Sequence, residues 1–152
     1  MSIIREFKGK DLNNIVYLME ILDYKLPPET VEKNINLFLE NKKNKIYVYE
    51  FNREVIGYIA IAIHHLLVTK YFRCRIENLV VDTKFRRKGV ASDLLNTIEK
   101  YALSQNVSII DVTSSQKREA EGAYTFYEKF GYINQGKENS KEARQYFRKR
   151  II

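Results

Sequence analysis

The chain has 152 residues, 45% of them hydrophobic, with six Gly, two Pro and a net charge of +7. This composition excludes a disordered or low-complexity chain and suffices for a single domain, which we place over residues 1–152. The positive charge favours an anionic partner but does not distinguish nucleic acid, anionic lipid and a phosphorylated cofactor.

The first half of the chain predicts a strand, two helices and three strands. Residues 3–7 are strand-like, and Asp11 can cap a helix whose apolar residues recur at 3.6-residue spacing. A second helix restarts after Pro27 and Pro28. The strands that follow are expected at residues 45–52 and 54–63, which form a hairpin, and at residues 75–82.

The second half predicts a helix from Gly89, a buried strand at 107–112, a helix around 119–130 and two final strands. The strand, helix, strand unit implies two parallel strands. Residues 143–152 alternate basic and apolar side chains, which we interpret as an edge strand. The order βααβββαβαββ indicates an α/β fold with a mixed central sheet of six or seven strands and helices on both faces.

A basic turn stands before the third helix. Lys84, Arg86, Arg87 and Lys88 crowd against Gly89, immediately after the strand that ends at Val81. A strand that leads through a glycine turn into a helix points backbone N–H groups and the positive helix dipole at one spot. The sequence has neither the P-loop pattern nor the dinucleotide fingerprint, yet this turn still predicts a site for a pyrophosphate.

Two segments resemble motifs of the Gcn5-related N-acetyltransferase (GNAT) family. Residues 86–91, RRKGVA, are similar to the acetyl-CoA loop of that family, (Q/R)-x-x-G-x-(G/A). Residues 123–132, AYTFYEKFGY, are similar to its FYxxxGF motif, with Tyr132 in place of the last Phe. The order of elements agrees over nearly the whole chain, so the resemblance implies the GNAT fold and acetyl-CoA as cosubstrate.

The resemblance also implies which residues bind the cofactor. The diphosphate is expected on the turn, and the pantetheine arm is expected to pair with the preceding strand, which splays open and offers a backbone donor to the thioester oxygen. The implied cofactor-binding residues are Leu79, Val80, Val81, Arg86, Arg87, Lys88, Gly89, Val90, Ala91 and Ser92.

Two catalytic residues are implied in the same way. Tyr127 matches the tyrosine that protonates the departing thiolate, whereas Phe126 and Phe130 are expected in the core. Glu77 is expected either to act as the base for the amine or to pair with Arg73 or Arg75. One departure is Ala120, which stands where many relatives have an asparagine that contacts pantetheine.

The histidines, the cysteine and the longest apolar run do not indicate a further site. His64 and His65 lack the neighbouring Cys or carboxylates of a metal site, so no metal is expected. The single cysteine, Cys74, is interpreted as structural; because it excludes an internal disulfide, we expect a cytoplasmic protein. The longest apolar run, residues 55–63, is too short to span a bilayer, and the N-terminus lacks a signal-peptide core, so no membrane partner is expected.

The leading hypothesis is therefore an acetyl-CoA-dependent N-acetyltransferase that acts on a primary amine of a small molecule, peptide or protein. The alternative is a non-catalytic acyl-CoA-binding or regulatory module with the same fold. Nucleic acid is not expected as a partner, because the charge gathers at one turn instead of interleaving with aromatic residues on one face. A homodimer is a further expectation from the resemblance.

Overall fold

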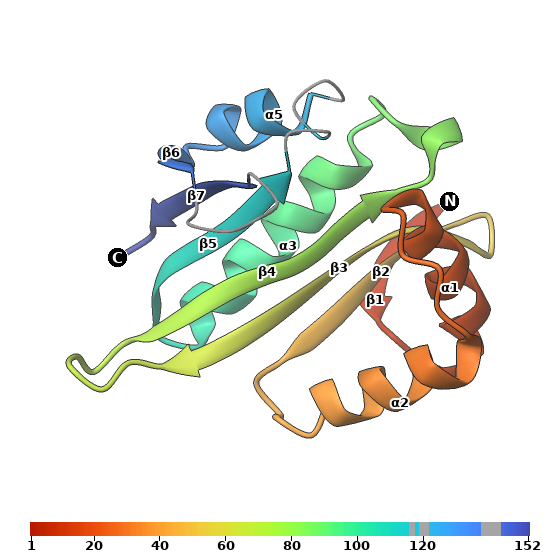
Figure 1. Ribbon diagram of the computed structural model, residues 1–152, viewed down its shortest axis with the longest axis horizontal. Helices are drawn as coiled ribbons and strands as arrows, with labels where there is room; N and C mark the ends of the chain where they lie inside the picture. The colour runs from red at the N-terminus through yellow and green to blue at the C-terminus, as the bar shows by residue number, and fades with distance from the viewer. Residues whose placement is uncertain (116–117, 119–121, 138–143) are drawn as a thin grey trace. The chain divides into compact units, whose positions relative to one another are not determined.

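The computed structural model describes residues 1–115, 118, 122–137 and 144–152. The described residues form seven strands accompanied by helices, in the order that the sequence predicts. Figure 1 shows their arrangement. The first elements are β1 (Ser2–Glu6), α1 (Leu12–Ile21), α2 (Pro28–Phe38), β2 (Lys45–Phe51), β3 (Glu54–His65) and β4 (Phe72–Val81). The rest are α3 (Val90–Ser104), β5 (Val107–Ser115), α5 (Ala123–Lys129), β6 (Ile133–Lys137) and β7 (Arg144–Arg150).

The strands form one mixed sheet in the order β1-β2-β3-β4-β5-β7-β6. β4 and β5 are parallel, as the strand, helix, strand pattern predicts, and the pairs β1–β2, β2–β3, β5–β7 and β6–β7 are antiparallel. The prediction that residues 143–152 form an edge strand is wrong, because β7 pairs with β5 on one side and β6 on the other. Its Phe147 is fully buried, which explains the apolar half of its alternation.

The chain divides into two compact units. Unit 1 comprises Met1–Ala62 and Glu77–Tyr101, and unit 2 comprises Ile63–Ile76 and Ala102–Ile152. In unit 1, α1 and α2 bury Ile15, Leu18, Val31 and Ile35 in one hydrophobic cluster with residues of β2 and β3. That residues 1–152 act as a single domain stays a prediction. None of the described helices combines the length and hydropathy that crossing a membrane requires.

Asp11 is the N-cap residue of α1, as predicted, but its side chain makes no capping hydrogen bond to the helix. A short 3-10 helix, Gly9–Asp11, precedes α1, so Asp11 already has helical backbone angles, and its carboxylate turns back to the chain before it. The carboxylate accepts hydrogen bonds from Arg5 Nη1 at 2.8 Å and from the Lys8 backbone N–H at 2.8 Å. Burial alone would raise the pKa of Asp11, but these donors hold it below its ordinary value.

A buried carboxylate joins three strands of unit 2. Asp111 of β5 is fully buried and accepts hydrogen bonds from Arg73 and from Arg75 Nε, the latter at 2.9 Å. The Tyr146 hydroxyl of β7 donates to the same carboxylate at 2.9 Å. A buried charge is tolerated only when donors surround it, so these contacts favour one register of β4, β5 and β7.

Candidate active site

The turn between β4 and α3 is fixed at its start by Asp82. The Asp82 backbone N–H donates to the Ile56 carbonyl oxygen of β3 at 2.8 Å, and its carboxylate accepts from the Lys84 backbone N–H at 3.0 Å. After a 3-10 turn at Thr83–Phe85, the backbone takes positive φ at Arg87 (62°) and at Gly89 (84°). A Cβ on Gly89 would meet no protein atom within 4 Å, so the backbone angle, not crowding by the protein, requires glycine.

The N-terminus of α3 is open at the end of this turn. The first hydrogen bond into the helix runs from the Asp93 N–H to the Gly89 carbonyl oxygen at 3.0 Å. The N–H groups of Val90, Ala91 and Ser92 therefore come before the first amide that can reach a carbonyl within the helix. Three such amides together with the helix dipole favour an anion, and the pyrophosphate site at this turn stays a prediction.

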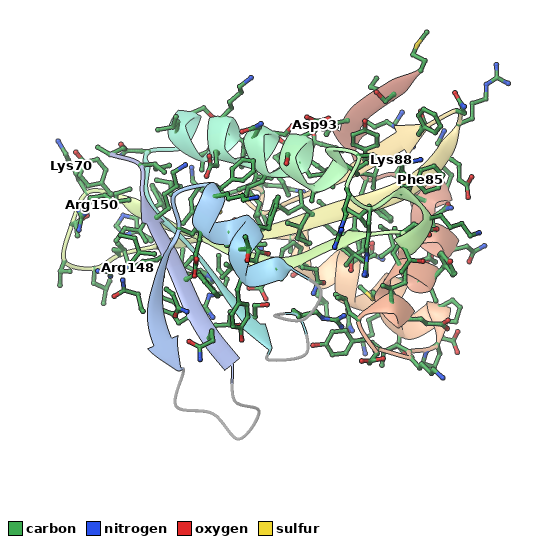
Figure 2. All side chains as sticks on the ribbon, turned by 90° about the horizontal axis from the view of Figure 1, so that it is seen from above. Lys70, Phe85, Lys88, Asp93, Arg148 and Arg150 are labelled. Carbon is green, nitrogen blue, oxygen red and sulfur yellow. The ribbon has the colours of Figure 1, made fainter. Side chains whose placement is uncertain are left out.

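The basic side chains of the turn differ in their surroundings. Arg87 and Lys88 are exposed, and Arg86 is half-buried. The Lys88 Nζ lies 5.7 Å from the centroid of the Phe85 ring, a cation–π contact, and Figure 2 shows both residues near the start of α3. Because a ring holds the Lys88 ammonium without neutralising it, its charge remains for an anion at the turn.

Gly57 of β3 is a residue near the turn that was not among the predicted site residues. A Cβ at this position would lie 3.0 Å from the Val80 carbonyl oxygen and 3.3 Å from Val90 Cγ1. Gly57 therefore lets β3 approach both the end of β4 and the first residue of α3. A single glycine within an apolar strand is the sequence signal for a close backbone approach, and residues 55–63 contain one.

Glu77, the candidate base, is exposed on β4. The alternative that it pairs with Arg73 or Arg75 is not supported, because both guanidinium groups bind Asp111. Next to Glu77, the Asn78 side chain donates to the Glu77 carbonyl oxygen at 2.7 Å and accepts from the buried Tyr58 hydroxyl at 3.3 Å. Glu77 forms no ion pair with any side chain in the described ranges, so its carboxylate remains available.

The ladder between β4 and β5 covers only part of β4. Its pairs run from Phe72 with Val107 to Arg75 with Asp111, while β4 itself continues to Val81. Leu79, Val80 and Val81, the residues expected to pair with pantetheine, belong to this continuation. Val80 and Val81 are buried and Leu79 is half-buried.

Tyr127, the candidate acid, lies on α5 with its ring enclosed by other aromatic rings. Ring centroids of Phe126, Tyr132 and Phe147 lie 5.3, 5.8 and 5.7 Å away. The described residues contain no fully buried side-chain oxygen without a hydrogen-bond partner. The Tyr127 hydroxyl bonds to none of them, so its oxygen must reach accessible space. Burial raises the pKa of this phenol well above its ordinary value, which keeps it protonated at neutral pH.

Three other residues were singled out in the sequence: Ala120, Cys74 and His65. Ala120 falls outside the described residues. Cys74 is fully buried, and the His65 ring packs on Phe72 with centroids 4.8 Å apart. The part of the chain that the structure describes holds no group of three or more His, Cys, Asp and Glu side chains able to bind a metal ion.

Gly57→Ala tests whether the close approach of β3 to α3 matters. The added methyl group must displace Val90 or the Val80 carbonyl, so we expect the free energy of unfolding to fall by about 1–3 kcal/mol in urea titrations. The amide NMR signals of Val90 and Ala91 should move. The matched control is Gly9→Ala, where a Cβ meets nothing within 4 Å. Equal stability of the two variants would contradict this role for Gly57.

Comparisons with known proteins found a matching family model and several similar structures. Residues 13–132 match the model of the acetyltransferase (GNAT) family. The structure is similar to Ard1 from Thermoplasma volcanium, with 20% identity, a TM-score of 0.80 and 99% and 98% of the two chains covered. It is also similar to glucosamine-6-phosphate N-acetyltransferase from Arabidopsis thaliana (19% identity, TM-score 0.79, 93% and 97% covered). A third similar structure is Naa50 from Arabidopsis thaliana in complex with the bisubstrate analogue CoA-Ac-MVNAL (20% identity, TM-score 0.75, 99% of each chain). Because the family model covers most of its length, the chain belongs to the acetyltransferase (GNAT) family.

Proposed function

We propose that this protein is an acetyl-CoA-dependent N-acetyltransferase that moves the acetyl group directly onto a primary amine of a small molecule, peptide or protein. The observation that carries the proposal is the open N-terminus of α3 after the turn at Arg87 and Gly89. Family membership supports acetyl transfer. The similar Naa50 structure, which contains a CoA-based analogue, supports acetyl-CoA as the cosubstrate.

In this proposal the cofactor binds along β4 and the turn. The diphosphate accepts hydrogen bonds from the N–H groups of Arg87 to Ser92, and Arg86, Arg87 and Lys88 add positive charge. The pantetheine arm pairs with Leu79–Val81, beyond the last β4–β5 pair, as an added strand would. A backbone N–H in this segment donates to the thioester oxygen, on which negative charge develops.

The chain's side chains would handle two protons. An alkylamine with a pKa of about 10.4 is almost fully protonated at neutral pH, so a base such as Glu77 is needed to take its proton, directly or through water. The neutral amine then attacks the thioester carbon, the C–S bond breaks, and the thiolate leaves. The attacking nitrogen then carries an extra proton. The Tyr127 phenol, held protonated by burial, would donate to the departing sulfur, and the extra proton on nitrogen would return to the phenol oxygen directly or through water, so that no tyrosinate remains. No acyl-enzyme is formed.

The environment we propose is the cytoplasm, where acetyl-CoA and a reduced Cys74 are both expected. A homodimer stays a prediction. The loop between α1 and α2 is one place to look for acceptor contacts, because its Tyr24 is exposed (48%).

Acetyl-CoA turnover tests the proposed function. We expect acetyl-CoA to raise the melting temperature by mass action, and free thiol to appear with at least one amine from a panel of polyamines, aminoglycosides and peptides. Desulfo-CoA, which cannot carry an acetyl group, is the control for binding without turnover. A thermal shift with no thiol release for any amine would instead favour the alternative, an acyl-CoA-binding module.

Tyr127→Phe tests the assigned acid. The variant keeps the ring in its aromatic cluster but removes the hydroxyl, so we expect kcat to fall by about 100-fold with the Kd of acetyl-CoA nearly unchanged. Tyr124→Phe is the matched control on the same helix, because its hydroxyl donates to the Ser114 carbonyl oxygen at 3.2 Å. A kcat unchanged by the Tyr127 substitution would remove this residue from the chemistry.

Glu77→Gln tests the assigned base. Loss of the carboxylate should lower kcat/KM at pH 7 by about 100-fold, and the deficit should shrink toward pH 10 as the amine loses its own proton. The control is Glu54→Gln, another exposed strand glutamate. A pH–rate profile identical to that of the unsubstituted protein would show that Glu77 is not the base.

A further inference from the structure

The positive charge of the chain is unevenly distributed. Unit 2 contains twelve Lys and Arg against six Asp and Glu, whereas unit 1, with the turn before α3, contains fourteen against thirteen. Six of the seven net positive charges therefore belong to unit 2. The four basic residues of the turn stand together in the sequence as described, but acidic residues elsewhere in unit 1 offset their charge.

Four arginines of unit 2 lie on one face of its sheet, which we name the arginine face: Arg73, Arg75, Arg148 and Arg150. Strand pairing sets them in two rows, since Ile109 pairs with Arg73 and Arg150, and Asp111 pairs with Arg75 and Arg148. The α5 helix packs on the opposite face, where Tyr124 and Tyr127 contact Phe147. Asp111 is the only acidic residue in the sequences 63–76, 107–115 and 144–152. Arg148 and Arg150 are exposed and form no ion pair with any described side chain.

An apolar hairpin tip stands beside this face. The side chains of Leu67 and Val68, between β3 and β4, are 99% and 92% exposed, a combination that is unusual for two adjacent aliphatic residues. The chain around them is held in place. The Tyr71 N–H donates to Thr69 Oγ1 at 2.8 Å, and the Asn106 side chain donates to the Lys70 carbonyl oxygen at 3.0 Å. The residues that follow the tip are therefore tied to the segment just before β5.

Backbone contacts place the hairpin tip at the end of the arginine face. The Phe72 N–H donates to the Asn106 carbonyl oxygen at 3.0 Å, and Ile109, three residues further, pairs with Arg150. Figure 2 shows Lys70, Arg148 and Arg150 gathered at one end of the molecule. Lys70 directly follows the tip and is exposed. The exposed side chains of Leu67 and Val68 thus lie near exposed basic residues.

We propose that the hairpin tip and the arginine face dock unit 2 on an anionic lipid bilayer. Leu67 and Val68 enter the interfacial region, and Lys70, Arg148 and Arg150 contact the acidic headgroups. Peripheral attachment needs two signals, apolar insertion and basic attraction, and both are present here. Two aliphatic side chains are too few for a stable protein interface, which buries about 800 Å² on each partner. A nucleic-acid backbone would bind the arginines but would leave Leu67 and Val68 in water.

A tryptophan at the tip gives a direct readout of insertion. The chain contains no Trp, so Leu67→Trp introduces the one tryptophan, whose emission can be excited apart from that of the tyrosines. We expect a blue shift of its emission, and quenching by brominated lipid, with vesicles that contain phosphatidylglycerol but not with phosphatidylcholine alone. Leu37→Trp is the control, because Leu37 is an exposed leucine (54%) on α2. Its emission should not change with either vesicle.

Charge and apolarity are then tested separately by vesicle co-sedimentation. The pair Arg148→Gln and Arg150→Gln should weaken partitioning by about tenfold or more, as should the pair Leu67→Ser and Val68→Ser. The matched charge control is the pair Lys33→Gln and Lys42→Gln, two exposed lysines of unit 1. That control should bind like the unsubstituted protein. Circular dichroism melting confirms that each variant is folded.

Three results would overturn the proposal. Equal binding to neutral and acidic vesicles would show that the arginine face is not involved. A dimer that only the tip substitutions dissociate, with no vesicle binding, would make a second copy of the chain the occupant. Tighter binding to single-stranded RNA than to vesicles, unaffected by the tip substitutions, would make nucleic acid the partner. None of these results depends on acetyl transfer.

Discussion

Three backbone amides without helical acceptors, at the start of α3, are the feature on which the proposed chemistry depends. They are presented by a turn with positive φ at Arg87 and Gly89. Glycine adopts such angles freely, whereas a residue with a Cβ adopts them at a cost in free energy. Strand β3 fixes the position of this turn. The Asp82 N–H donates to the Ile56 carbonyl oxygen, and Gly57, which has no side chain, leaves room for Val90. The proposed anion site would therefore be a property of the backbone, with the basic side chains adding charge to it.

In unit 2, the buried carboxylate of Asp111 needs hydrogen-bond donors. A fully buried carboxylate is destabilising unless donors surround it, and two guanidinium groups and a phenol do so. These contacts consume Arg73 and Arg75 and so leave Glu77 without an arginine partner. They also mark the last described pair between β4 and β5. Removal of Asp111 would leave the half-buried Arg73 and Arg75 without their shared acceptor, so the cluster constrains the register of these strands.

The sequence predicted the features that local pattern encodes, and missed those that depend on distant segments. The order of elements and the turn before Gly89 follow from periodicity and from one glycine, and the tyrosine of the FYxxxGF-like segment could be named from its motif. Asp111 could not be matched to Arg73 and Arg75, because their contact joins separate strands. The place of β7 inside the sheet depends on β6. Asp11 is the N-cap of α1, but its carboxylate binds Arg5 and the Lys8 N–H because a 3-10 helix precedes α1. The hairpin tip could not be predicted, because Leu67 and Val68 form a run far shorter than a membrane-spanning segment and their exposure is visible only in the structure.

The central claim is that the N-terminus of α3 binds the diphosphate of coenzyme A. A titration of ¹⁵N-labelled protein with coenzyme A, followed by amide NMR, tests it most directly. The account predicts large, saturable shifts for the amides of Val90, Ala91 and Ser92, with adenosine 3′,5′-bisphosphate, which lacks the 5′-diphosphate, producing much smaller ones. If coenzyme A bound while these three amides stayed in place, the diphosphate would lie elsewhere and the account would be contradicted.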